Sequence, residues 1–134
     1  MKNAPPITIL IVSDDATRLG KIQERMIAWG YRAYPMTLDE SLERRPPFDG
    51  GLIILDLGLP ASGSSLHIPR LKALYPDSRI ITLTWQNTRP LEIAVRRQGV
   101  GCYLVASADM QDLKTVVDHA AMMAMTAVPQ SIAS

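Results

Sequence analysis

Short apolar segments alternate with longer amphipathic segments along the chain. The run Ile7–Val12 is rich in β-branched residues and is followed by the polar Ser13–Asp15, which is typical of a strand buried on both faces. Beyond it, apolar residues recur at three- and four-residue spacing up to Gly30, which predicts a helix that begins at Asp14 or Asp15. The chain is therefore expected to start with a strand and a helix.

The same alternation continues toward the C-terminus. Further strands are predicted at 31–34, 52–55, 79–83 and 102–105. Further helices are predicted at 37–45, 64–75 and 90–98, and a last one opens at Ser107 or Asp109. Pro69 either lies in the first turn of its helix or bends it, and Pro90 suits a first turn. Alternating strands and helices predict an α/β fold, a five-stranded, doubly wound parallel sheet with helices on both faces.

Length and composition narrow the class of protein. The 134 residues have room for one domain, expected over 1–127, with 128–134 as a tail or the beginning of a linker. A net charge of +1 gives no field that would favour nucleic acid or an acidic membrane. Cys102 is the only cysteine, which suits a reducing cytoplasm, and no signal peptide or membrane span is evident.

Polar side chains follow the predicted strands at their C-terminal ends. In a doubly wound sheet, sites form at this edge, near the point where the strand order reverses. The residues that this rule collects are Ser13, Asp14, Asp15, Asp56, Thr84 and Ala106. Carboxylates can attack phosphorus and can bind Mg²⁺, which prefers hard oxygen ligands. A candidate site is therefore expected at this edge of the sheet, with Asp56 among its carboxylates.

Four segments resemble the successive motifs of response-regulator receiver domains, which have the flavodoxin-like fold called CheY-like. They are Ile9–Asp15, Ile54–Pro60, Ile80–Thr84 and Gly99–Val105, and the similarity covers about 7–121. The resemblance implies the strand order 2-1-3-4-5, a two-component phosphorelay as the setting, and a histidine kinase or phosphotransfer protein as partner. It also implies that an effector domain or a second copy of the chain can be a partner.

The resemblance also implies roles for matched residues. Asp56 corresponds to the aspartate that accepts the phosphoryl group. Asp14, Asp56 and the backbone carbonyl of Gly58 correspond to the ligands of Mg²⁺. Thr84 corresponds to the hydroxyl that binds the phosphoryl group, and Tyr103 to the aromatic residue that changes rotamer with it.

Three departures from the family pattern weaken this chemistry. Receiver domains have a lysine directly after the fifth strand, where this chain has Ala106–Ser107, and Arg89 is the nearest replacement cation that the sequence suggests. They have two adjacent acids where this chain has Ser13–Asp14, although Asp15 follows as an auxiliary acid. They have a small residue where this chain has Trp85, which is expected to shield Asp56.

Two functions remain open. In the first, Asp56 is phosphorylated and the face formed by the fourth helix, fifth strand and fifth helix changes its partner affinity. In the second, the domain is a pseudo-receiver that docks or dimerises without phosphorylation, and the missing lysine and Trp85 favour it slightly. Asp14 suits a helix cap as well as a metal ligand, and Tyr103 suits packing better than switching. No conventional enzyme site is expected.

Overall fold

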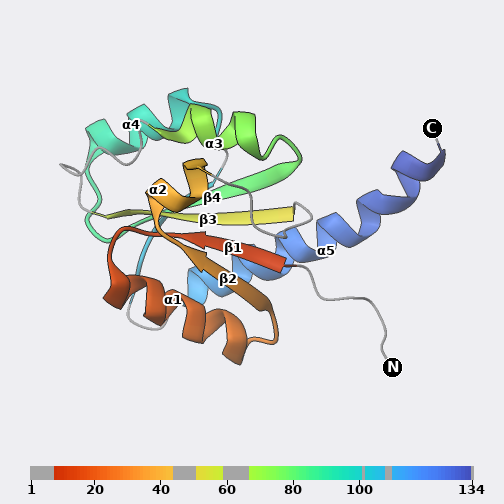
Figure 1. Ribbon diagram of the computed structural model, residues 1–134, viewed down its shortest axis with the longest axis horizontal. Helices are drawn as coiled ribbons and strands as arrows, with labels where there is room; N and C mark the ends of the chain where they lie inside the picture. Colours follow the sequence, from red (N-terminus) through yellow and green to blue (C-terminus); the bar gives the residue numbers. More distant parts are fainter. Residues whose placement is uncertain (1–7, 44–50, 59–66, 101, 108–109, 134) are drawn as a thin grey trace.

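The computed structural model of the chain describes residues 8–43, 51–58, 67–100, 102–107 and 110–133, with the side chains of 124–133 excepted. Its strands form one parallel sheet in the order β2-β1-β3-β4-β5 (Figure 1). The strands are β1 (Thr8–Val12), β2 (Arg32–Met36), β3 (Gly51–Gly58), β4 (Ser78–Thr84) and β5 (Cys102–Val105). The helices are α1 (Ala16–Ala28), α2 (Leu38–Glu43), α3 (Ile68–Leu74), α4 (Arg89–Arg97) and α5 (Gln111–Ala133). The predicted fold class and strand order are confirmed.

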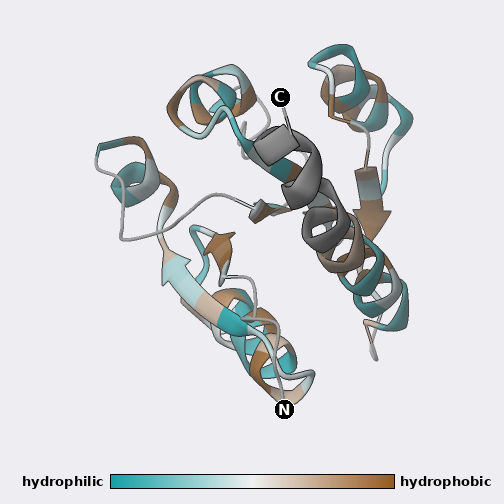
Figure 2. Ribbon diagram, turned by 90° about the vertical axis from the view of Figure 1, so that its right-hand side faces the viewer, coloured by the Kyte–Doolittle hydropathy of each residue, from teal (hydrophilic) through white to brown (hydrophobic). Residues whose placement is uncertain are grey.

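Helices cover both faces of the sheet, because side chains alternate between the faces along each strand. Leu10 and Val12 of β1 point to one face, where they pack in a cluster with residues of α2, α3 and α4. Ile9 and Ile11 point to the other face, where the cluster includes residues of α1 and α5. Each of the helices α1 to α4 carries both hydrophilic and hydrophobic residues, as expected of helices that cover a sheet (Figure 2).

Side-chain caps explain where the helices begin. The Asp15 carboxylate accepts a hydrogen bond from the backbone N–H of Arg18 at 2.9 Å and so caps α1. Thr37 and Glu40 cap α2 reciprocally, since each side chain accepts a hydrogen bond from the other's backbone N–H. Thr88 caps α4, and Pro90 lies in the first turn of that helix.

Some boundaries differ from the prediction. The strand β3 continues to Gly58, so that Asp56 lies within the strand and not just beyond it. The helix α5 runs to Ala133, although a tail was expected from Val128 onward. Pro69 lies in the first turn of α3, whereas the residues 64–66 expected before it are outside the described residues. Among the described residues, no helix is both long and apolar enough to cross a membrane.

Candidate functional site

Asp56 projects from β3 toward the face of the sheet that α1 and α5 cover. Its direction follows from the alternation along the strand, because Leu52 and Ile54 belong to the core cluster on that face. Ser13, directly after β1, lies beside it, and the two side chains are hydrogen-bonded at 2.6 Å. Asp56 is only 3% exposed, so its carboxylate depends on the protein for hydrogen bonds.

The carboxylate of Asp56 accepts four hydrogen bonds among the described residues. Oδ2 accepts from the hydroxyl of Ser13 at 2.6 Å and from Nε of Arg18 at 2.8 Å. Oδ1 accepts from the backbone N–H of Gly58 at 2.9 Å and from Nε1 of Trp85 at 3.0 Å. An ionised carboxylate has about four acceptor sites, so these donors use its whole capacity. An oxygen that attacks phosphorus uses one of these lone pairs, so at least one of the four hydrogen bonds would have to be given up.

Arg18 supplies a positive charge beside this buried carboxylate. It lies in the first turn of α1, and its guanidinium also approaches the Asp15 carboxylate at 3.3 Å. The Arg18 side chain is 25% exposed and that of Asp56 is 0% exposed, so the ion pair is closed on the Asp56 side and reached by water on the other. Asp15 therefore both caps α1 and orients Arg18, and its backbone hydrogen bond from Arg18 lowers the pKa of its carboxyl.

Sequence reasoning missed Arg18, and its suggestion of Arg89 as the replacement cation was wrong. Only residues at strand ends were collected, and Arg18 lies on a helix. The sequence did offer one signal. Arg18 comes three positions after Asp15, the predicted cap, and a residue at that spacing lies in the first turn of the helix, next to the strand ends. Arg89 is exposed in the first turn of α4, on the other side of the sheet from α1.

Trp85 lies over Asp56, as its bulk at this position suggested. It follows β4 directly and packs against the core cluster on the α1 and α5 face. Its indole N–H donates to Oδ1 of Asp56, so the ring adds a hydrogen bond as well as cover. On the same side, a cavity of about 620 Å³ is lined by Trp85, Ala106, Ser107 and residues of α1.

Asp14 does not face Asp56 in a shared arrangement of ligands. Its Oδ1 accepts a hydrogen bond from the backbone N–H of Leu38 at 3.1 Å, at the start of α2. Together with Thr37 and Glu40, this contact satisfies N–H groups that the first turn of a helix leaves without partners. The geometry of Asp14 is thus that of a capping residue.

Thr84 and Gly58 lie next to each other on paired strands. Gly58 is opposite Thr84 in the register, whereas Leu83 is opposite Asp56. The Thr84 hydroxyl lies 3.4 Å from the carbonyl oxygen of Gly58 and 3.0 Å from that of Gln86. Gly58 has a φ of 69°, a left-handed conformation that suits glycine, and its N–H turns back to Asp56. The Gly58 carbonyl expected to bind Mg²⁺ thus lies next to the Thr84 hydroxyl.

Tyr103 lies on β5, away from Asp56. Its hydroxyl donates to the side chain of Asn87 at 2.8 Å, and the guanidinium of Arg96 lies 6.0 Å from the ring centroid. Burial raises the pKa of the Tyr103 hydroxyl. The ring also packs at the margin of the core cluster on the α4 face. These contacts, and not Asp56, account for the position of Tyr103.

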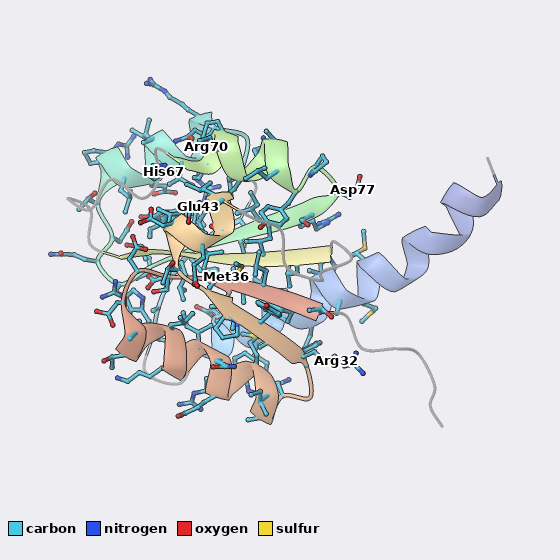
Figure 3. All side chains as sticks on the ribbon, in the orientation of Figure 1. Arg32, Met36, Glu43, His67, Arg70 and Asp77 are labelled. Atoms are coloured by element: carbon cyan, nitrogen blue, oxygen red, sulfur yellow. The ribbon has the colours of Figure 1, made fainter. Side chains whose placement is uncertain are left out.

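The surroundings of Asp56 do not fit a Mg²⁺ ion. Both oxygens of Asp56 are occupied, Asp14 is turned to α2, and the guanidinium of Arg18 lies between Asp56 and Asp15. In the described part of the chain, no group of three or more acidic, histidine or cysteine side chains is placed to hold a metal ion. Figure 3 shows His67 at the start of α3, whereas Arg32 and Asp77 lie near the N-terminal ends of β2 and β4, at the other end of the strands from the Asp56 site.

Comparisons with known proteins agree with this architecture. No family model matches the chain. Over 114 residues the chain is 30% identical to the DNA-binding transcriptional regulator NtrC of Azospirillum brasilense, and this match covers 84% of the chain and 24% of that protein. The chain thus spans about a quarter of the length of the curated relatives that it matches.

Solved structures resemble it over most of their own length. A CheY-like response regulator from Mesorhizobium loti matches with a TM-score of 0.70 and 21% identity, covering 87% of this chain and 99% of that one. A response regulator from Burkholderia pseudomallei matches with a TM-score of 0.70 and 22% identity, covering 90% of this chain and 71% of that one. The latter structure holds a phosphorylated aspartic acid and a calcium ion. The chain therefore has the fold of CheY-like response-regulator receiver domains. In sequence, it is similar to part of the NtrC regulators.

Proposed function

We propose that this domain is a receiver-type interaction module that works without phosphorylation of Asp56. The observation that carries the proposal is the carboxylate itself, whose two oxygens accept hydrogen bonds from Ser13, Arg18, Gly58 and Trp85. A phosphoryl donor would have to displace at least one of these contacts, and hydrogen bonds to charged groups are worth about 1.5–3 kcal/mol each. The domain binds partners and does not turn over a substrate.

The proposed partner surface is the face formed by α4, β5 and α5. Ile93 of α4 is 40% exposed and Val105 of β5 is 43% exposed, although both are apolar. Exposed apolar residues of this kind contribute to docking when a partner covers them. Tyr103 of β5 donates a hydrogen bond to Asn87, which links this face to the segment before α4. Candidate partners are a second copy, an effector domain, or a kinase or phosphotransfer protein of the phosphorelay.

A phosphorylatable receiver is the competing function. The position of Asp56 at the C-terminal edge of the sheet favours it, and the B. pseudomallei neighbour carries a phosphorylated aspartic acid. Mass spectrometry of the intact protein after incubation with acetyl phosphate and Mg²⁺ separates the two functions. We expect no phosphoryl adduct on the wild-type domain. An adduct that the Asp56→Asn variant fails to form would contradict the proposal.

Partner binding is tested on the same proteins. If docking is independent of phosphorylation, Asp56→Asn leaves it unchanged, whereas Ile93→Asp on the proposed face weakens it. Sedimentation at two protein concentrations measures this for a second copy as the partner. Self-association that Asp56→Asn removes and Ile93→Asp leaves intact would contradict both the mechanism and the surface.

A further inference from the structure

A guanidinium occupies the place between two carboxylates that a divalent cation would need. Arg18 Nε lies 2.8 Å from Oδ2 of Asp56, and Arg18 Nη1 lies 3.3 Å from Oδ2 of Asp15. The two acids come from different parts of the fold, Asp56 from β3 and Asp15 from the cap of α1. Arg18 therefore joins the strand to the helix through charge, as a metal ion shared by both acids would do.

The burial of Asp56 makes the positive charge of Arg18 necessary. The side chain of Asp56 is fully buried, and a carboxylate taken out of water is costly unless it is paired and hydrogen-bonded. The other donors to Asp56, which are a hydroxyl, an indole and a backbone N–H, carry no formal charge. Within the described residues, Arg18 is thus the cation in contact with Asp56. Its side chain supplies the positive charge that a bound metal ion would otherwise supply.

The same geometry excludes a second cation. A Mg²⁺ ion needs oxygen ligands at about 2.1 Å in a near-octahedral arrangement. Each oxygen of Asp56 already accepts two hydrogen bonds, and an ion at this point would lie against the positive guanidinium. Asp14, the further acid at this edge, has its Oδ1 engaged by the N–H of Leu38.

We infer that Arg18 is a built-in replacement for a divalent cation, which keeps the Asp56 site neutralised and makes the domain indifferent to Mg²⁺. This inference rests on the proposed function, since a permanently neutralised Asp56 is what a phosphorylation-independent receiver needs. It goes beyond that function by assigning the role to one side chain of α1. It also implies that the site becomes sensitive to divalent cations once the guanidinium is removed.

Thermal unfolding in EDTA and in increasing Mg²⁺ tests the inference. The wild-type midpoint is expected to be the same in both conditions. Arg18→Gln is expected to lower the midpoint in EDTA, because Asp56 and Asp15 lose their shared cation, and added Mg²⁺ is expected to raise it again in a saturable way. The double variant Arg18→Gln with Asp56→Asn lacks the buried charge, so Mg²⁺ is expected to have no effect on it. Lys21→Gln, an exposed cation of the same helix, is the matched control and is expected to behave like wild type.

Two results would overturn the inference. The first is saturable binding of Mg²⁺ to the wild-type domain in isothermal titration, if Asp56→Asn abolishes that binding. This experiment does not require any Arg18 variant to fold. The other is a folded Arg18→Gln protein whose unfolding midpoint is indifferent to Mg²⁺. Neither result is a measurement of phosphorylation. If the wild-type domain formed a phosphoryl adduct but bound no Mg²⁺, the proposed function would be wrong, whereas the inferred role of Arg18 would still be supported.

Discussion

Asp56 follows a run of apolar residues in β3, and a buried carboxylate at that position depends on donors that the protein supplies. Ser13, Arg18, Gly58 and Trp85 supply them from four separate points of the chain. Each contact alone is ordinary, but together they use every acceptor site of the carboxylate. At the scale of single residues, this saturation is the observation that supports the proposal of a receiver that works without phosphorylation.

Replacing Trp85 by phenylalanine keeps an aromatic ring and removes the hydrogen bond to Asp56. The free energy of unfolding, measured by urea denaturation, is expected to fall by about 1.5–3 kcal/mol because the bond lost is made to a charged group. Trp29→Phe is the matched control, since Trp29 caps the far end of α1. Equal destabilisation by the two substitutions would show that the indole N–H contributes nothing to the Asp56 site.

The sequence predicted part of the site at this scale. Asp56 was found because an acid after an apolar strand is conspicuous, and Trp85 because its bulk is unusual there. Arg18 was not found, because its long side chain reaches the site from a helix and no periodicity records where a flexible side chain ends. The capping geometry of Asp14 was one of two alternatives that the sequence left open, because both need an acid in the same position.

At the scale of helices and strands, Asp14 joins the end of β1 to the start of α2, because its side chain accepts a hydrogen bond from the N–H of Leu38. Asp14→Ala is expected to destabilise the domain by about 0.5–2 kcal/mol, the usual cost of losing a helix cap. Asp14→Asn is expected to cost much less, because an asparagine side chain still accepts a hydrogen bond from the N–H of Leu38. Chemical denaturation of both variants measures this. If Asp14→Asn were as harmful as Asp14→Ala, the carboxylate charge would matter and the capping account of Asp14 would be wrong.

A second link joins the end of α1 to α5. The Tyr31 hydroxyl donates to Oδ1 of Asp118 at 2.5 Å, and Lys114 donates to the other oxygen of the same carboxylate at 2.7 Å. Burial and the neighbouring Asp118 raise the pKa of Tyr31 to about 12, while the hydrogen bond from Lys114 and that from Tyr31 lower the pKa of Asp118. The cluster thus joins the segment between α1 and β2 to α5 on one face of the sheet.

These shifts predict a pH dependence that Tyr31→Phe removes. The folded-state pKa of Tyr31 lies above its ordinary value of 10.0, so its stabilising contribution is complete below pH 10.0 and is lost as the pH rises toward about 12. The stability difference between wild type and Tyr31→Phe is therefore expected to shrink over that window. Urea denaturation at several alkaline pH values measures it, with Tyr34→Phe as the control. A difference that stays constant from neutral pH to pH 12 would contradict the assigned link.

At the scale of the whole molecule, the fold was the feature that the sequence predicted best. Buried parallel strands carry continuous apolar runs, and helices that cover them carry a periodic stripe, so the alternation along the chain was enough to predict the doubly wound sheet. The length of α5 was less predictable, because Pro129 and the small residues around it favour a stop that the helix does not make. The strand order came from the resemblance to receiver domains, since pattern alone does not order parallel strands.

At the scale of the whole molecule, the proposed function requires the receiver fold to be held in one state by its own side chains. Arg18 and Trp85 close the site from α1 and from the end of β4, and the contact between Tyr103 and Asn87 holds β5 to the segment before α4. The module is then expected to present the same surface whether or not a phosphoryl donor is present.

The most direct test of this claim is the response of the whole domain to beryllofluoride and Mg²⁺, a mimic of the phosphorylated state. In ¹H–¹⁵N spectra, the indole resonance of Trp85, assigned with Trp85→Phe, and the amide resonances of β4, α4 and β5 are expected to remain where they are when the mimic is added. The same indole resonance is expected to shift in Asp56→Asn, because its acceptor has changed. A new, saturable set of resonances in the wild-type domain, absent from Asp56→Asn, would contradict the account.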